Sequence, residues 1–131
     1  IYQDEDSDIW IGTDNGLNKV IQNSSGKITN FKRYLNVLKD SFNINQNEVY
    51  ALCEDNSGKL WIGTNGGGLV LLDKKTETFT RYTHDPLDPR SISYNEIRSL
   101  FKDKSGTMWI GTYGSGIDKV SRGAGEFILY K

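Results

Sequence analysis

Short runs of aliphatic, β-branched and aromatic residues, separated by turn residues, fill the middle of the chain. Four such runs, the composition that pleated strands favour, lie at residues 49–54, 60–64, 69–73 and 78–83. The segments between them contain Asp, Asn, Ser and Gly, whose local hydrogen bonds or positive φ angles favour turns. No segment repeats apolar residues with helical spacing over three turns, so the pattern predicts four strands and no long helix.

The same pattern occurs three times along the chain. The tetrapeptide Trp-Ile-Gly-Thr begins at residues 10, 61 and 109, and residues 47–82 align with residues 95–130 without a gap. Four antiparallel strands in about 40–50 residues form one blade of a propeller. We therefore predict an all-β fold: a β-propeller fragment of three four-stranded antiparallel blades. It forms one partial propeller domain, 1–131, whose repeats span residues 1–46, 47–94 and 95–131.

The first copy of the repeat departs from the other two. Ile1 occupies the place of Leu52 and Leu100, so the first strand of this blade is expected to be truncated. Ser7 replaces the turn glycine of the other copies. The chain also begins inside a strand and without Met, so we expect it to be an excised piece of a longer protein.

The tryptophans and the single cysteine are expected to be core residues. Each Trp falls on the second strand of its copy, where a large aromatic side chain can fill the space between neighbouring blades. Cys53 occupies the position of Tyr2 and Phe101, which favours a small buried side chain over a reactive thiol.

Composition and charge exclude two classes of partner. The 131 residues carry 16 basic and 17 acidic side chains, a net charge of -1, and these are scattered along the chain. The absence of a basic stripe speaks against a nucleic-acid partner. No run of 18 apolar residues is present, so the sequence predicts no direct membrane insertion.

The motif itself resembles a known repeat. Residues 47–69 read Asn-Glu-Val-Tyr-Ala-Leu-Cys-Glu-Asp-Asn-Ser-Gly-Lys-Leu-Trp-Ile-Gly-Thr-Asn-Gly-Gly-Gly-Leu, which is similar to the two-component regulator propeller repeat. The resemblance extends over essentially the whole chain. It implies seven-bladed propellers, commonly two per sensor, on the extracytoplasmic (periplasmic or cell-surface) side of bacterial membrane receptors. Such receptors carry a cytoplasmic histidine kinase or diguanylate cyclase, and the best-known propeller regions sense carbohydrate fragments.

Candidate ligand-binding residues lie in two kinds of connection, which emerge on the same face of a propeller. These are the connections from fourth to first strand and from second to third strand, and loops on a rigid scaffold are where binding residues concentrate. Tyr with Asn and Arg suits a sugar, because it offers a flat apolar face beside hydrogen-bonding groups. Tyr50 and Arg98 occupy equivalent positions on the innermost strand and are expected to line the channel. The candidates are Asn65, Tyr113, Tyr94, Arg98, Tyr50 and Arg90. The alternative interpretation is that these are solvated turn residues.

Catalytic and metal-binding motifs are not expected. The acidic segment from Asp4 to Asp8 begins like a calcium loop, but Ile9 stands where Gly is needed and Asn15 where a bidentate Glu is needed. His84 is the only histidine, and we expect neither a His-based triad nor a cluster of metal-ligating histidines. We therefore expect no catalytic residue, no metal and no cofactor, and consider the fragment itself not to be an enzyme.

The sequence leaves three functions open. The favoured one is an extracytoplasmic sensor propeller that binds a small molecule, for which the resemblance implies a carbohydrate, or relays its binding. A propeller enzyme of lyase or glycosidase type and a pure protein-interaction scaffold are the alternatives.

The outer blades are expected to find further partners. Three blades are too few to close a ring, and repeat arrays normally carry polar outer faces at their ends. Copies one and three instead keep apolar second strands. A homo-oligomer of two chains closing a six-bladed ring would bury both faces.

Overall fold

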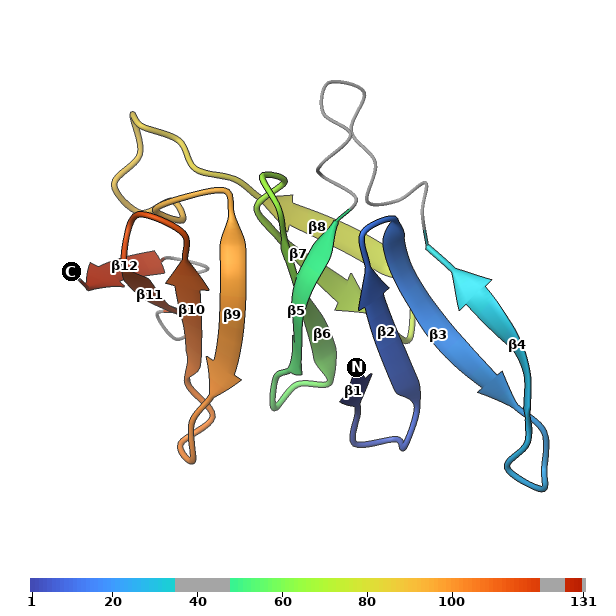
Figure 1. Cartoon of the computed structure of the whole chain (residues 1–131). Coiled ribbons are helices and arrows are strands. Elements are labelled where there is room, and N and C mark those ends of the chain that lie inside the picture. The colour runs from blue at the N-terminus through green and yellow to red at the C-terminus, as the bar shows by residue number, and fades with distance from the viewer. Residues whose placement is uncertain (35–47, 121–126, 131) are drawn as a thin grey trace.

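The protein forms three antiparallel four-stranded sheets, which confirms the predicted three-bladed propeller fragment (Figure 1). The structure is a computed structural model that describes residues 1–34, 48–120 and 127–130. In the described residues every regular element is a strand. Blade 1 comprises β1 (Tyr2–Gln3), β2 (Ile9–Thr13), β3 (Gly16–Gln22) and β4 (Ile28–Arg33). Blade 2 comprises β5 (Val49–Glu54), β6 (Lys59–Thr64), β7 (Leu69–Asp73) and β8 (Thr78–Tyr82). Blade 3 comprises β9 (Ile97–Lys102), β10 (Met108–Thr112), β11 (Ile117–Val120) and β12 (Phe127–Tyr130).

Within each sheet the strands follow one another in chain order. The first strand of blade 1 is only two residues long, in agreement with the predicted truncation. Strand β5 packs against β9 and β2, so the first strands lie along the inner side of the assembly. The last strands, β4, β8 and β12, form the outer edges of the blades (Figure 1).

Two hydrophobic clusters fill the spaces between blades. Trp10 and Trp61 are 1% and 5% exposed, and each occupies the cluster between its own blade and the next, as predicted. Trp109, at the same position in blade 3, is half-buried. The first cluster contains Trp10, Leu17, Tyr34, Val49, Leu60, Ile62, Val70 and Leu72. The second contains Cys53, Trp61, Leu69, Ile92, Ile97, Met108 and Ile110.

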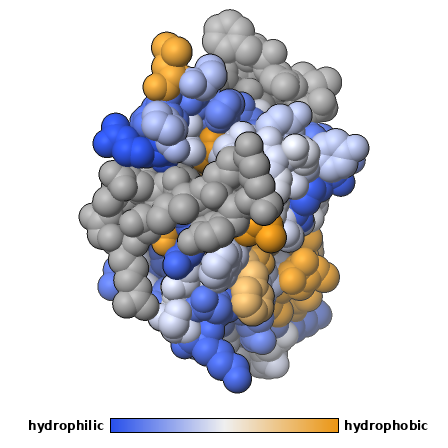
Figure 2. Space-filling view, turned by 90° about the vertical axis from the view of Figure 1, so that its left-hand side faces the viewer, coloured by the Kyte–Doolittle hydropathy of each residue, from blue (hydrophilic) through white to orange (hydrophobic). Residues whose placement is uncertain are grey.

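The outer face of blade 3 repeats the chemistry of an internal face. Cys53 and Leu69 of blade 2 are 7% and 0% exposed, because they pack against blade 3. Their equivalents Phe101 and Ile117 are 64% and 48% exposed. Figure 2 shows this side of the molecule, where hydrophobic residues reach the surface among hydrophilic ones. The surface that blade 2 buries against its neighbour is thus partly open on blade 3.

The glycine of the Trp-Ile-Gly-Thr motif lets the next blade approach. A Cβ atom on Gly12 would lie 2.5 Å from Val49 Cγ1, and one on Gly63 would lie 2.7 Å from Ile97 Cγ2. Real Cβ atoms do not come so close to their neighbours, and protein interiors leave little room to shift. The first strand of each following blade therefore packs directly against the glycine backbone of the preceding β2 or β6.

A repeated aspartate ties each tryptophan to the turn before its strand. In every blade the indole nitrogen of Trp donates a hydrogen bond to Oδ2 of the aspartate six residues earlier. The three pairs are Trp10 with Asp4 at 2.9 Å, Trp61 with Asp55 at 2.8 Å and Trp109 with Asp103 at 2.9 Å. The other carboxylate oxygen accepts backbone N–H groups of the same turn. The Asp side chain thus closes its turn and fixes the tryptophan ring.

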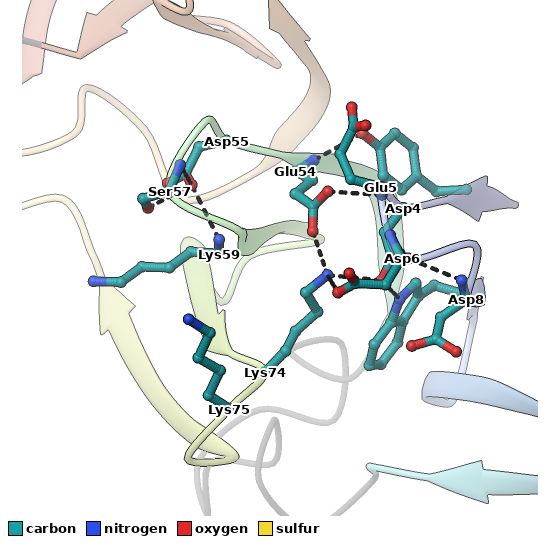
Figure 3. A network of polar contacts seen from close by, with 12 residues as sticks. Asp4, Glu5, Asp6, Asp8, Glu54, Asp55, Ser57, Lys59, Lys74 and Lys75 are labelled. Atoms are coloured by element: carbon teal, nitrogen blue, oxygen red, sulfur yellow. Dashed lines mark hydrogen bonds and ion pairs between the residues drawn. The ribbon is translucent and has the colours of Figure 1, made fainter.

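Lys74 holds blades 1 and 2 together through buried carboxylates (Figure 3). Its ammonium group lies 2.8 Å from Asp4 Oδ2, forms an ion pair with Glu54, and reaches the exposed Asp6 at 3.4 Å. The Asp4 and Glu54 side chains are 0% and 1% exposed, and that of Lys74 is 13% exposed. Burial alone would lower the pKa of Lys74, but its two close carboxylates raise the pKa above the ordinary value. The lysine therefore remains charged and compensates both acids.

We expect Gly63→Ala to lower the free energy of unfolding by about 1–3 kcal/mol, because the added methyl group would overpack the contact with Ile97. Urea denaturation would measure the loss. The control is the same change in an Ile97→Ala background, where the closest side-chain atom is gone. An equal cost in both backgrounds would show that the contact is not the cause.

Lys74→Met should destabilise the protein by about 3–5 kcal/mol, the usual cost of leaving buried carboxylates without their partner. The matched control is Lys75→Met, since Lys75 is the exposed neighbour of Lys74 on the same turn. Thermal or urea unfolding compares the two variants. Similar stability of the two would mean that the buried ion pairs contribute nothing.

The Asp–Trp pair of blade 3 predicts a pH dependence. Hydrogen bonds from Ser105 and Trp109 lower the pKa of Asp103 from 3.8 to about 2. A depressed pKa in the folded state stabilises the protein above pH 3.8, and this contribution is lost as the pH falls toward about 2. Asp103→Asn should therefore show a shallower loss of stability over this interval than the parent or Lys104→Gln. Parallel pH profiles would contradict the assignment.

Candidate functional site

Two kinds of connection emerge at one end of the blades. In Figure 1 the β2–β3, β6–β7 and β10–β11 turns and the β8–β9 loop lie at the upper end, and the tight turns before β2, β6 and β10 lie at the lower end. We call the upper end the loop face. The predicted arrangement, with both kinds of connection on one face, is confirmed for the connections that the structure describes; the connection at residues 35–47 lies outside the described residues.

Three of the predicted ligand residues form a stack on the loop face. The guanidinium carbon of Arg98 lies 4.5 Å from the ring centre of Tyr50 and 4.8 Å from that of Tyr113. Arg98 Nε donates a hydrogen bond of 2.8 Å to Glu96 Oε1, which raises the pKa of Arg98. Tyr113 is 60% exposed, so one face of the stack is open to solvent. An arginine between two aromatic rings is held by cation–π attraction as well as by its ion pair.

Asn65 joins this stack to the end of blade 2. Its side-chain Nδ2 donates a hydrogen bond of 2.8 Å to Glu48 Oε2, and its backbone N–H donates one of 2.9 Å to Glu48 O. Asn65 also forms a β-bridge with Glu96 of blade 3. Burial raises the pKa of Tyr50, and the nearby Glu48 carboxylate raises it further. We call Glu48, Tyr50, Asn65, Glu96, Arg98 and Tyr113 the Arg98 cluster.

The other two candidates lie in the loop between blades 2 and 3. Tyr94 is 41% exposed, and its ring lies 3.9 Å from where a Cβ on Gly114 would stand, so it rests on the turn that carries Tyr113. Arg90 pairs with Asp88, with 3.1 Å between Nε and Oδ1. The structure thus brings Tyr94 beside the Arg98 cluster and places Arg90 within the β8–β9 loop.

A cavity of about 770 Å³ opens between the β8–β9 loop and the β10–β11 turn. It is lined by polar residues and two prolines of the loop from His84 to Ser93 and by Gly114, Ser115 and Gly116 of the turn. From the sequence these residues were not grouped into a pocket, and only His84 among them was named. The sequence signal was the length of the β8–β9 connection, because the other connections of blades 2 and 3 within the described residues are only four or five residues long.

Comparison with known proteins identifies the repeat. The sequence model for the two-component regulator propeller matches residues 43–66 and 91–114. These two segments of the chain match two-component regulator propeller repeats. This confirms the resemblance that the Trp-Ile-Gly-Thr motif suggested.

The proteins to which this chain is similar are signalling proteins. Histidine kinase P4 of Formosa agariphila is 37% identical over 82 residues, which is 60% of this chain and 6% of the kinase. The extracellular domain of a hybrid two-component system from B. thetaiotaomicron is 27% identical, with a TM-score of 0.82 over 99% of this chain and 18% of that one. A second such extracellular domain from B. thetaiotaomicron is 27% identical, with a TM-score of 0.74 over 98% of this chain and 18% of that one. The chain therefore spans less than a fifth of the length of these relatives.

Aspartate side chains of residues 4–8 form ion pairs within the protein. Asp4 and Asp6 contact Lys74, and Asp8 pairs with Lys19 at 2.8 Å. Across residues 1–34, 48–120 and 127–130, no group of three or more His, Cys, Asp or Glu side chains is arranged to hold a metal ion. The part of the chain that the structure describes also contains no helix long and apolar enough to cross a membrane.

Proposed function

We propose that the chain is part of the extracytoplasmic sensor propeller of a two-component-type receptor and binds a small polar molecule, such as a carbohydrate, on its loop face. The location is supported by the two matched structures, which are extracellular domains of two-component systems. The receptor context is supported by the matched histidine kinase. The proposal thus has three parts: a kinase output in the whole receptor, an extracytoplasmic location and a small polar ligand.

The Arg98 cluster carries the binding proposal. Tyr113 and Tyr94 expose flat apolar faces, as stacking against a sugar ring requires. Glu48, Glu96 and Asn65 contribute polar groups to the same cluster. Flat aromatic surface next to a few fixed polar groups is the usual composition of a small-molecule site.

Ligand binding would engage two blades at once. The cluster combines residues of blade 2 (Tyr50, Asn65) with residues of blade 3 (Arg98, Tyr113). A ligand that contacts both blades stabilises their relative placement by its binding free energy. This is a physical route by which a rigid scaffold could relay occupancy to the rest of a receptor.

The proposal predicts that Tyr113→Ala weakens oligosaccharide binding about tenfold, or about 1.4 kcal/mol. Isothermal titration with a panel of neutral and charged oligosaccharides, followed by repetition with each variant, measures the change. Phe101→Ala is the matched control, since Phe101 is an equally exposed aromatic residue outside the cluster. Binding that survives Tyr113→Ala but is lost on changing the Asp55 or Asp103 turns would place the site on the opposite face.

A further inference from the structure

The cavity beside the β10–β11 turn has the dimensions of a small-molecule site. Its volume of about 770 Å³ falls within the range of roughly 300–1,000 Å³ typical of ligand pockets. It lies on the loop face, and its wall at Gly114 follows directly after Tyr113 of the Arg98 cluster.

The loop that forms the cavity is braced by its own hydrogen bonds. The Asp85 backbone N–H donates to Ser91 Oγ at 2.9 Å, and Ser91 Oγ donates back to Asp85 O at 3.0 Å. The His84 backbone N–H donates to Asn95 Oδ1 at 2.6 Å. Because these contacts fix both ends of the loop, a ligand would not have to order it on binding.

The polar groups that line the cavity are mainly acceptors. His84 Nδ1 lies 2.8 Å from Ile92 O, and since a carbonyl oxygen only accepts, Nδ1 carries the proton and Nε2 is the acceptor of the neutral ring. The hydroxyl hydrogen of Ser91 is committed to Asp85 O, and that of Ser93 to Asp118 Oδ2. Both serines therefore offer lone pairs rather than hydrogens.

Asp118 adds a buried carboxylate behind this wall. It is 0% exposed, and its Oδ2 accepts hydrogen bonds of 2.9 Å from both the backbone N–H and the hydroxyl of Ser93. Among the residues that the structure describes, its Oδ1 has no hydrogen-bond partner. Val70 occupies the equivalent position in blade 2, so the repeat does not require a carboxylate here. A buried unpartnered oxygen costs free energy, which calls for a role outside the packing of the blade.

The charge of the cavity is negative. Asp85 and Asp88 line it, Asp118 lies behind Ser93, and Arg90 pairs with Asp88. Three carboxylates therefore lie in or behind the wall of the cavity, and the Arg90 guanidinium pairs with one of them, that of Asp88. An anionic ligand would meet like charges, whereas hydroxyl or ammonium groups would meet acceptors.

We propose that this cavity is a ligand subsite that takes a hydroxyl-rich, non-anionic molecule, with Asp118 orienting the Ser93 hydroxyl as an acceptor. The proposal rests on the proposed sensor function and narrows it, because it assigns the site and excludes acidic ligands. Neutral sugars and amino sugars both have this chemistry, because they carry several hydrogen-bond donors and no carboxylate or sulfate. Asp118 is here a positioning residue.

Titration of the purified protein with three probes of equal length tests the charge preference. The probes are cellotetraose, which is neutral, the tetramer of chitosan, which is cationic, and tetragalacturonate, which is anionic. We expect one or both of the first two to bind at millimolar concentration or better, and at least about tenfold more tightly than tetragalacturonate. Equal or tighter binding of tetragalacturonate would overturn the proposal, and so would binding of none of the three.

Two variants test the place of binding. Ser115→Tyr fills the cavity from a partly exposed position and should weaken binding about tenfold or more, whereas Lys104→Tyr, on the opposite face, should not. The double variant Asp85→Asn and Asp88→Asn keeps the acceptor oxygens that Leu87 and Arg90 use but removes two charges. It should raise the affinity for tetragalacturonate relative to that for cellotetraose several-fold. Circular dichroism and thermal unfolding verify that each variant is folded.

The outcomes separate this inference from the proposed function. Oligosaccharide binding that Tyr113→Ala abolishes and Ser115→Tyr leaves unchanged would overturn the cavity subsite while keeping the sensor proposal. Unchanged discrimination against tetragalacturonate in the double variant would overturn the charge argument. The absence of binding to these probes and to the wider oligosaccharide panel would overturn both.

Discussion

The close approach of neighbouring blades at the motif glycines is the constraint on which the rest of the structure depends. Val49 packs against the backbone of Gly12, and Ile97 packs against that of Gly63, where a Cβ atom would clash. This contact fixes the position of the first strand of each following blade. The two hydrophobic clusters include Val49 and Ile97, and they bury Trp10 and Trp61. Because tightly packed interfaces do not deform continuously, this contact sets the distance and the angle between blades.

That rigid spacing allows two blades to share one site. The Arg98 cluster stacks residues from β5, β9 and the β10–β11 turn, and the cavity joins the β8–β9 loop to the same turn. A small change in the angle between blades 2 and 3 would separate Tyr50 from Arg98 and Asn65 from Glu96. Ligand binding at the proposed site would therefore depend on the relative position of the two blades, as the proposed sensing role requires.

The fold was predictable from the repeat, whereas the polar network was not. The periodicity of the tetrapeptide and the gapless alignment of copies two and three were sufficient for the blades, the strand order and the placement of the tryptophans. The pairing of Asp55 with Trp61 was missed because the aspartate already had a local explanation as a turn residue. Lys74 and Asp4 are 70 residues apart, and no sequence pattern links them. The equivalence of Tyr50 and Arg98 indicated a shared location, but their stacking depends on the offset between blades.

Amide hydrogen exchange, with and without cellotetraose or the chitosan tetramer, tests most directly the claim that the loop face is the binding face. The account predicts that ligand slows exchange in residues 84–93 and 113–116, because they form the cavity and the adjoining turn. The tight turns at 55–58 and 103–106 should be unaffected. Protection confined to those turns, or no protection at saturating ligand, would contradict the account.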